Sequence, residues 1–527
     1  MRKQKLLRKG KLTNFRMIIL LFILPISIIN ALDYEVVDTG QVKYFDNQIE
    51  IFAPGQTDPF FGQDAQFNGN QPNYTNNGDD TITDTVTGLM WSKTCDTDGD
   101  GDIDVDDKLS YEEAMNSISN VNIGGYNDWR IPTIKEQYSL ILFSGIDPSG
   151  FEGSAEDLVS FIDTDYFEFA YGDTLAGERL IDAQMITSTL YVGDPEMMFG
   201  VNFADGRIKG YGTGPMPGQT EDKKFYVYYV RGNENYGIND FDDNGNETIS
   251  DNSSALMWSQ NDSEETLNWE EALAWVQQKN TENYLGYSDW RLPNVKELQS
   301  ILDYTRAPDT LNSAAIDPLF NCTEITNVGG ETDYPYYWSG TTHENWTSDN
   351  GGFASYVSFG RALGWMEEPP MSGNYTLIDV HGAGAQRSDP KDGDPANFPY
   401  GNGPQGDVVR IFNYVRLVRD FDPVVGVNDD EMGNLTPVQI KLSNYPNPFN
   451  PTTTINFEIS GDAKENIEII IYNIKGEKVK RFSELTNQGS IVLNGNDEKN
   501  KPVSSGMYLY SISANGNSYF SKMLLLK

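Results

Sequence analysis

The middle of the chain contains two copies of one sequence unit, and this repeat constrains the fold more than any other feature. The order of the matched segments is the same in both copies, which indicates duplication of a whole folding unit. We therefore expect two tandem domains, at 32–238 and 239–421. The matched segments are 89–92 and 256–259, 111–114 and 269–272, 125–132 and 286–293, 135–136 and 296–297, 201–203 and 357–359, and 229–231 and 414–416.

Each copy is predicted to be an α+β domain with two helices before most of its strands. Ser, Thr or Asn begins each helix and Glu follows three residues later, which is the pattern of a capping box. In copy two we expect strands over 336–342, 354–359 and 408–418, from their β-branched and aromatic content. The predicted cap pairs are Ser110–Glu113, Thr133–Glu136, Asn268–Glu271 and Asn294–Glu297.

Four tryptophans and two arginines recur at matched places in the copies. The tryptophans adjoin helix starts and apolar runs, which favours core packing over stacking on a sugar. The arginines could bind an anionic ligand, but pairing with a nearby carboxylate is favoured in so acidic a chain. These residues are Trp91, Trp129, Trp258, Trp290, Arg130 and Arg291.

The repeated motifs resemble a known family, the Lcl C-terminal domain. The motifs are Leu-Met-Trp, Trp-Glu-Glu-Ala, Gly-Tyr-x-Asp-Trp-Arg-x-Pro-x-x-Lys-Glu and Tyr-Val-Arg. The resemblance implies an extracellular module of bacterial surface proteins, with a C-type-lectin-like fold and an adhesin that binds sulfated glycans among its members. It implies no catalytic residues.

Copy one contains an acidic loop, residues 96–107, that copy two lacks. Its Asp-x-Asp-x-Asp-Gly pattern is typical of a calcium loop, in which carboxylates at positions 1, 3 and 5 converge on the ion. The predicted ligands are Asp96, Asp98, Asp100, the backbone carbonyl of Asp102, and Asp107 at position 12. Calcium is therefore the predicted cofactor, and its role is structural. The alternative is a solvated acidic loop.

A second acidic stretch, at 240–245, contains only the first half of such a pattern. Asn244-Gly245 before Thr248 favours a hairpin turn instead. The equivalent Asn77-Gly78 of copy one has no preceding aspartates, which supports this interpretation.

Copy two carries a long Gly-, Pro- and Asp-rich stretch between Trp365 and Asp407, where copy one has far fewer residues. Long irregular loops on a compact domain are usually functional or disordered. Aromatic faces can stack on a sugar while polar groups bind its hydroxyls. The predicted glycan-binding residues are Trp346, Trp365, His343 and His381. A purely structural loop is the alternative.

The first 31 residues are predicted to be a signal peptide. Seven basic residues precede an uncharged apolar run at 17–29, which is too short to span a membrane, and Ala31 offers a cleavage site. Export permits a disulfide. Whether Cys95 and Cys322 pair remains open from the sequence.

The C-terminal residues differ in character from the rest. After a linker at 422–438, short strands are expected between turns over 439–527, which suggests an all-β immunoglobulin-like sandwich. The stretch Tyr-Pro-Asn-Pro-Phe-Asn-Pro-Thr at 445–452, with Ser-Gly-Met-Tyr-Leu-Tyr at 505–510, resembles the type A sorting domain of the type IX secretion system. That resemblance implies a secreted or cell-surface protein, the secretion machinery as a partner, and no transmembrane span in the mature form.

The net charge limits the classes of ligand that the protein can bind. Residues 32–433 carry 21 basic and 70 acidic residues, a net charge of −49, so nucleic acid is excluded as a partner. The same charge predicts weak binding to heparin-like glycans and favours a neutral extracellular glycan or cell-surface ligand. The sequence thus predicts a non-enzymatic, adhesin-like binding protein. A secreted polysaccharide hydrolase is the alternative.

Overall fold

The sequence repeat corresponds to two equivalent four-stranded antiparallel sheets, ordered β12-β5-β4-β3 in copy one and β13-β14-β15-β23 in copy two. The computed structural model describes residues 34–215, 219–367, 369, 372–421, 439–447, 449–460, 467–473, 478–486, 488–499, 501–514 and 517–527. The predicted signal peptide and linker lie outside these residues. The chain divides into two units, Met1–Val425 and Gly426–Lys527.

The strands of the two small sheets occupy matching places in the sequence. Those of copy one are β3 (Tyr74–Asn76), β4 (Thr81–Asp84), β5 (Leu89–Ser92) and β12 (Val230–Gly232). Those of copy two are β13 (Phe241–Asp243), β14 (Thr248–Asp251), β15 (Leu256–Ser259) and β23 (Val418–Asp420). Short pairs complete the framework: β1 (Tyr44–Phe45) with β2 (Glu50–Ile51), β6 (Leu109–Ser110) with β11 (Lys224–Phe225), and β16 (Ile325–Thr326) with β17 (Thr332–Asp333).

The helices begin where the caps predicted them. All four predicted capping boxes form: the cap side chain accepts the N3 backbone N–H, and the N3 glutamate accepts the cap backbone N–H. The capped helices are α1 (Tyr111–Ser117), α2 (Ile134–Ser139), α3 (Trp269–Thr281) and α4 (Val295–Ser300). A further short helix is α5 (Pro308–Leu311), and 3₁₀ turns lie at Asp64–Gln66, Ile118–Asn120, Ala155–Asp157, Tyr284–Gly286 and Pro395–Asn397.

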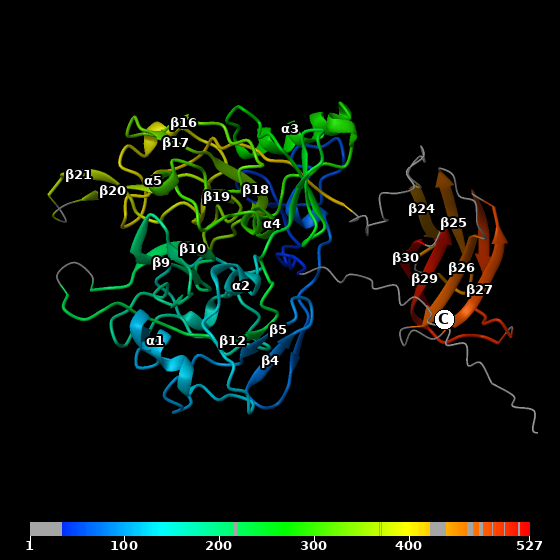
Figure 1. Ribbon diagram of the computed structural model, residues 1–527, viewed down its shortest axis with the longest axis horizontal. Helices are drawn as coiled ribbons and strands as arrows, with labels where there is room; N and C mark the ends of the chain where they lie inside the picture. Colours follow the sequence, from blue (N-terminus) through cyan, green and yellow to red (C-terminus); the bar gives the residue numbers. More distant parts are fainter. Residues whose placement is uncertain are drawn as a thin grey trace, which may run out of the picture. The chain divides into compact units, whose positions relative to one another are not determined.

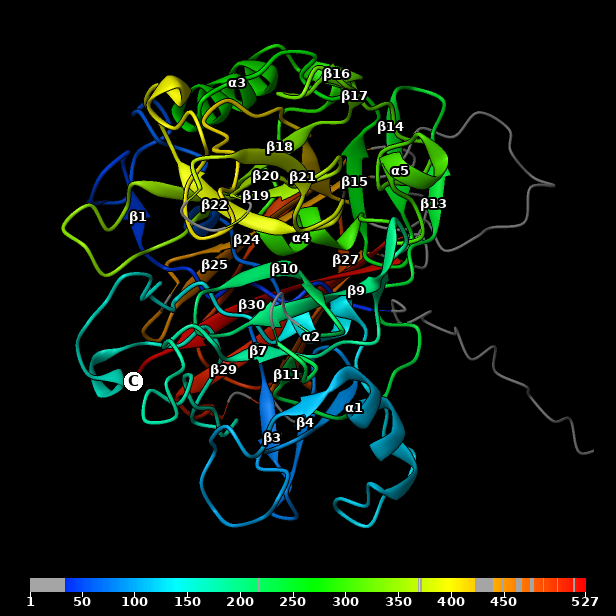
Figure 2. The ribbon, with the colours of Figure 1, turned by 90° about the vertical axis from the view of Figure 1, so that its left-hand side faces the viewer.

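A single seven-stranded sheet joins the two copies, so they form one unit. Its order is β18-β19-β22-β10-β9-β7, with β8 also paired to β9, and the copies meet where Ile208 of β10 pairs with Gln386 of β22. Both views show copy one on one side of this junction and copy two on the other (Figures 1 and 2). The strands are β7 (Gln184–Met185), β8 (Leu190–Tyr191), β9 (Asp194–Asn202), β10 (Arg207–Gly212), β18 (Tyr336–Thr342), β19 (Phe353–Ser358) and β22 (Gln386–Pro390).

The hydrophobic core also crosses the junction. One cluster of buried side chains contains Trp91 and Phe199 from copy one and Trp258 and Val357 from copy two. All four repeated tryptophans are buried, as predicted. Arg130 and Arg291 pair with Glu136 and Glu297, so the predicted structural role of the arginines is confirmed.

Two equivalent lysines connect the helices of the two copies. Lys135 of α2 donates to the carbonyl of Ser300, the last residue of α4, at 2.7 Å. Lys296 of α4 donates to the carbonyl of Ser139, the last residue of α2, at 2.9 Å. Each helix therefore has its C-terminal carbonyl bonded by the other copy's lysine, as in an isologous dimer.

Burying an ammonium group costs desolvation free energy, and further hydrogen-bond acceptors around each lysine offset that cost. Lys135 also donates to the Gly237 carbonyl and to Asn239, while Lys296 also donates to the Asp38 carbonyl. Burial lowers the pKa of Lys135 to about 8 and that of Lys296 to about 7.

The N-terminal segment, residues 34–70, packs against copy two although it precedes copy one. Gln41 exchanges two hydrogen bonds with the backbone of Thr342, at 2.7 and 2.9 Å. Lys43 pairs with Glu344 at 2.9 Å. The segment therefore adds a further connection between the copies.

Two predictions about the end of copy two were wrong. Only Val418 of the predicted strand at 408–418 lies in a strand, because β23 covers Val418–Asp420. The repeat alignment there shifts by three residues, because Val418 pairs with Trp258 as Val230 pairs with Trp91. Arg419, rather than Arg416, is therefore the counterpart of Arg231.

The realigned arginines have the same partner in each copy. Arg231 binds Asp128 at 2.7 Å, and Arg419 binds Asp289 at 2.8 Å. These aspartates precede the repeated Trp-Arg pair. The Asp-Trp-Arg motif therefore fixes the helix-bearing loop to the small sheet through one carboxylate and one guanidinium.

The stretch between Trp365 and Asp407 is more regular than predicted. A hairpin of β20 (Leu363–Glu367) and β21 (Tyr375–Asp379) occupies its first part, and strand β22 and a 3₁₀ turn follow. The hairpin projects at the left of Figure 1.

The C-terminal unit consists of two antiparallel sheets around one core. The first sheet is ordered β24-β25-β28 and the second β27-β26-β29-β30, and buried side chains of both contribute to the same cluster. The strands are β24 (Gln439–Tyr445), β25 (Thr453–Ser460), β26 (Ile467–Asn473), β27 (Lys478–Leu485), β28 (Gln488–Leu493), β29 (Gly506–Ala514) and β30 (Asn517–Leu525).

Within the described parts of the chain, no helix is both long and apolar enough to cross a bilayer.

The crossed lysines yield a stability prediction. Lys296→Met keeps the apolar stem but leaves the carbonyls of Asp38 and Ser139 without this donor. We expect the free energy of unfolding to fall by about 2–3 kcal/mol, because a buried acceptor left unpaired costs about 1–3 kcal/mol. Guanidinium denaturation of the mature chain measures the change. The exposed control Lys224→Met should shift stability by less than about 0.5 kcal/mol.

The difference between wild type and Lys296→Met should also widen from pH 7 to pH 9.5. The folded pKa of Lys296 is about 7, whereas an unfolded lysine titrates near about 10.4. The unfolded state therefore binds more protons in this window, so the wild-type lysine contributes more stability as pH rises. A difference that narrows with pH would contradict the burial of this amine.

Candidate functional site

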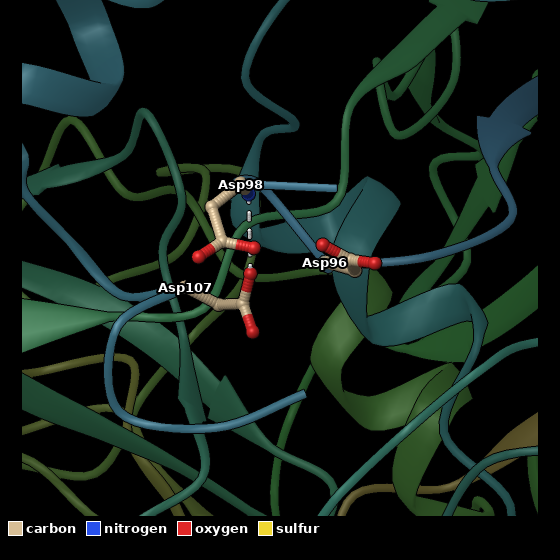
Figure 3. A group of neighbouring side chains, drawn as sticks. All are labelled: Asp96, Asp98 and Asp107. Carbon is tan, nitrogen blue, oxygen red and sulfur yellow. Dashed lines mark hydrogen bonds between the residues drawn. The ribbon is translucent and has the colours of Figure 1, made fainter. Parts of the chain in front are cut away.

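The acidic loop of copy one brings three of its predicted ligands together. Carboxylate oxygens of Asp96, Asp98 and Asp107 lie within 4.8 Å of one another (Figure 3). Asp107 is buried beneath the loop, whereas Asp98 is exposed. The side chains of Asp100 and Asp102 lie outside this three-carboxylate group.

Backbone N–H groups hold the two ends of the loop in place. Asp107 accepts from Thr97 at 2.6 Å with one oxygen and from Asp104 at 2.9 Å with the other. Asp96 accepts from Gly101 at 3.1 Å, and Gly101 has the positive φ of 98° that the predicted sharp turn requires. Positions 1 and 12 of the loop are therefore fixed by the chain itself.

The three-carboxylate group has the chemistry of a hard-cation site. All of its ligand atoms are carboxylate oxygens, which Ca²⁺ prefers and which soft metals do not. Calcium takes six to eight oxygens, so backbone carbonyls or water would complete the sphere. The residues present fit the predicted ion.

The second acidic stretch is a hairpin turn, as predicted. The Asn244 N–H donates to the Thr248 carbonyl at 3.1 Å between β13 and β14, and Gly245 has φ of 70°. Asp242 accepts a hydrogen bond from the Asn252 side chain at 2.9 Å.

His343 does not fit the predicted glycan-binding role, because its side chain is buried. Its ring packs against Phe143 and Phe161, with centroid distances of 6.0 and 5.3 Å. Burial and the nearby Arg207 lower the pKa of His343 to about 3, so the ring is neutral. The residue belongs to the core at the junction of the two copies.

His381 is also buried and holds a neighbouring loop instead of facing solvent. Its Nε2 lies 3.1 Å from Asp407, which also pairs with Arg387. Its Nδ1 lies 3.5 Å from the Gly210 carbonyl of copy one. His381 therefore positions Asp407 and cannot contact an external sugar directly.

The two predicted tryptophans lie in different surroundings. Trp346 is 43% exposed, but its ring packs on Phe151 of copy one and its indole N–H donates to the Ser149 carbonyl at 2.9 Å. Trp365 lies on strand β20 of the projecting hairpin. Of the four predicted residues, Trp365 alone joins a partly exposed aromatic cluster.

This aromatic cluster consists of Trp365, Tyr375 and Tyr400. Trp365 and Tyr375 share one face of the hairpin, because Trp365 pairs with Leu377 and Tyr375 with Glu367. Tyr400 stacks on Tyr375 with centroids 4.1 Å apart and an angle of 15°, and meets Trp365 edge-on at 6.3 Å. Tyr375 is 37% and Tyr400 52% exposed.

The loop that carries Tyr400 is fixed from beneath. The Trp365 N–H donates to the Gly406 carbonyl at 2.7 Å, and Asn402 exchanges two 2.8 Å backbone bonds with Asp407. Because Asp407 also binds His381, the predicted histidine supports the aromatic cluster indirectly.

The sequence prediction missed Tyr375 and Tyr400. One signal was available for Tyr375: Gly373-Asn374 separates two apolar runs and favours a hairpin. No comparable signal marks Tyr400, which reaches the cluster only through tertiary contacts.

Both cysteines are free thiols. Cys95 is buried, and burial raises its pKa to about 12. Cys322 lies 3.4 Å from the Tyr337 hydroxyl. Neither thiol is poised for reaction, because a nucleophilic cysteine needs a lowered pKa.

The sequence matches the Lcl C-terminal domain over 80–231 and 247–376. The chain belongs to this family. Residues 443–526 match the secretion system C-terminal sorting domain. The two Lcl domains correspond to the two copies, and the sorting domain marks the chain for export to the outer cell surface or the medium.

Other comparisons add little. No curated protein matches the chain. Among solved structures, a dimeric latent PorU from Porphyromonas gingivalis is 11% identical, with a TM-score of 0.16, over 39% of this chain and 20% of its own. A β-glucuronidase from Ruminococcus gnavus is 10% identical, with a TM-score of 0.13, over 29% and 27%. The chain therefore spans about a quarter or less of these proteins.

The sorting domain yields a prediction about the exported form. We expect extracellular protein to lack most of 439–527, because the resemblance to type IX sorting domains implies removal of the domain after it has directed export. Intact-mass and peptide analysis of the secreted and surface fractions of the native host measures this. Extracellular copies that uniformly keep Lys527 would contradict it.

Proposed function

We propose that the Lcl unit is a non-enzymatic, adhesin-like binding module that takes a neutral glycan on its exposed aromatic cluster. The observation that carries this is the stacked, nearly parallel pair of rings of Tyr375 and Tyr400 beside Trp365 at the projecting hairpin. Partly exposed rings on a firmly held loop offer a stacking face without an ordering cost on binding. We also propose that the Lcl domains have a C-type-lectin-like fold and that the sorting domain has an immunoglobulin-like fold.

Charge supports a neutral ligand over a sulfated one. The net charge of −49 over 32–433 repels polyanions, although salt screens this beyond about 8 Å. Stacking and hydrogen bonding to hydroxyls depend little on ionic strength, whereas ionic contacts depend on it strongly.

The glycan prediction is tested by titrating the mature chain with neutral and sulfated oligosaccharides at two salt concentrations. We expect salt-insensitive binding of a neutral sugar, reduced about two- to tenfold in Trp365→Ala and Tyr400→Ala, since ring stacking contributes about 0.5–1.5 kcal/mol. Trp346→Ala is the matched control, because this exposed tryptophan lies outside the cluster.

Three outcomes would contradict the proposal. Tight, salt-sensitive heparin binding would reverse the charge argument. Unchanged affinity in Trp365→Ala would remove the cluster as the site. Turnover of chromogenic glycosides would favour the alternative of a secreted polysaccharide hydrolase.

We also propose that Asp96, Asp98 and Asp107 hold a structural Ca²⁺. Three carboxylates within 4.8 Å repel one another unless a cation neutralises them. Asp100, which the loop pattern also predicts as a ligand, would have to turn inward on binding, and the Asp102 carbonyl would complete the set.

Calcium should therefore raise the melting temperature of the mature chain relative to a chelator. The stabilisation should be about 2.7 kcal/mol when free calcium is about a hundred times its Kd. Asp96→Asn with Asp98→Asn should abolish the calcium-dependent rise. The matched control is Asp240→Asn with Asp242→Asn in the hairpin of copy two, which should keep it. A wild type that melts identically with calcium and chelator would show a solvated loop.

A further inference from the structure

Copy two has a surface that the chain itself covers. Residues 60–67 of the N-terminal segment lie on it, with Phe60 stacked on Trp269 at 6.3 Å. The Asp64 carboxyl accepts hydrogen bonds from Thr341 at 2.6 Å and from Thr39 at 2.7 Å. The Phe67 ring lies 5.8 Å from the guanidinium of Arg291. This segment therefore docks through three contacts, made by the ring of Phe60, the carboxyl of Asp64 and the ring of Phe67.

Within residues 34–215 and 219–367, which the structure describes, no segment covers the equivalent surface of copy one in this way. Leu273 of α3 is 1% exposed, whereas its counterpart Met115 of α1 is 37% exposed. Thr342, the last residue of strand β18, is 0% exposed, whereas its counterpart Leu190 is 37% exposed. The residues of copy one that match the covered surface therefore face solvent.

Chain length explains the difference. The segment that precedes the small sheet of copy one is long enough to reach copy two, where residues 34–70 lie. The connection before the small sheet of copy two, from Gly232 to Phe241, is short. Its residues Tyr236 and Gly237 pack near Lys135, but nothing in it corresponds to residues 60–67.

A cavity of about 680 Å³ lies beside the uncovered surface of copy one. Arg130, Ser188 and Thr189 line one wall, and Ile238 of the short connection and Asp303 of copy two line others. Arg130 and Thr189 are the counterparts of Arg291 and Thr341, which hold Phe67 and Asp64 in copy two.

The threonine geometry is the same in both copies. Thr341 accepts the Val295 N–H at 3.0 Å and donates its own proton to Asp64. Thr189 accepts the Ile134 N–H, also at 3.0 Å. The Thr189 oxygen accepts this hydrogen bond, and its hydroxyl proton can donate to a group that enters the cavity.

We propose that this cavity of copy one binds a peptide segment of another protein, with an aromatic residue followed four positions later by an aspartate and three further on by a second aromatic. Such a peptide would dock as residues 60–67 dock on copy two. The carboxyl accepts from Thr189 and the second ring lies over Arg130, both of which line the cavity. The first ring lies on Tyr111 of α1, the counterpart of Trp269. This site is independent of the hairpin cluster.

The chain supplies its own probe for the test. A blocked synthetic peptide of residues 58–68 is titrated into the mature chain, and binding is followed by calorimetry. We expect one site per chain. An Asp64→Asn peptide, or Thr189→Val in the protein, should weaken binding about tenfold or more, because a hydrogen bond to a charged group contributes about 1.5–3 kcal/mol. Thr75→Val, at an exposed threonine of β3, is the control.

A double-mutant cycle separates contact from misfolding. If Thr189 donates to the peptide carboxyl, the Asn peptide and Thr189→Val together should weaken binding no more than either change alone. Thr305→Trp, at the exposed rim of the cavity, should block binding without touching the α2 hydrogen bond. Absence of peptide binding at millimolar concentration, or full additivity in the cycle, would overturn the proposal.

Discussion

The crossed hydrogen bonds of Lys135 and Lys296 are the contact on which the rest of the Lcl unit depends. Each buried ammonium ends the equivalent helix of the other copy, at Ser300 and Ser139. Each buried lysine thus finds one of its hydrogen-bond acceptors in the other copy, and losing that acceptor would leave a buried donor with fewer partners. The shared seven-stranded sheet and the common core join the same two copies.

Duplication then allowed the copies to diverge outside the shared frame. Capping boxes and Asp–Arg pairs are the same in both, because they set the helix starts and fix the small sheets. The acidic loop is present in copy one alone, and the aromatic hairpin in copy two alone. One scaffold thereby carries two different surfaces.

The N-terminal segment adds a further asymmetry, since it covers copy two and leaves the matching surface of copy one open. Within copy two, the two histidines that were expected to face a ligand became internal supports. Burial makes His343 neutral among aromatic rings, and His381 holds Asp407 beneath the exposed Tyr400. The residue type suggested that His343 and His381 bind a ligand, but their burial gives both side chains a structural role.

The sequence by itself determined the repeat, the four capped helices, the buried tryptophans, the hairpin at Asn244-Gly245 and the sorting domain, because these depend on local spacing and hydrogen bonds. Three carboxylates that lie close together in the acidic loop, those of Asp96, Asp98 and Asp107, were also among the residues that the loop pattern predicted. Only the tertiary structure decided that the copies share a sheet, that Arg419 and not Arg416 matches Arg231, and that Tyr400 joins Trp365. Those outcomes depend on contacts between residues far apart in sequence, where strand register and burial leave no local pattern.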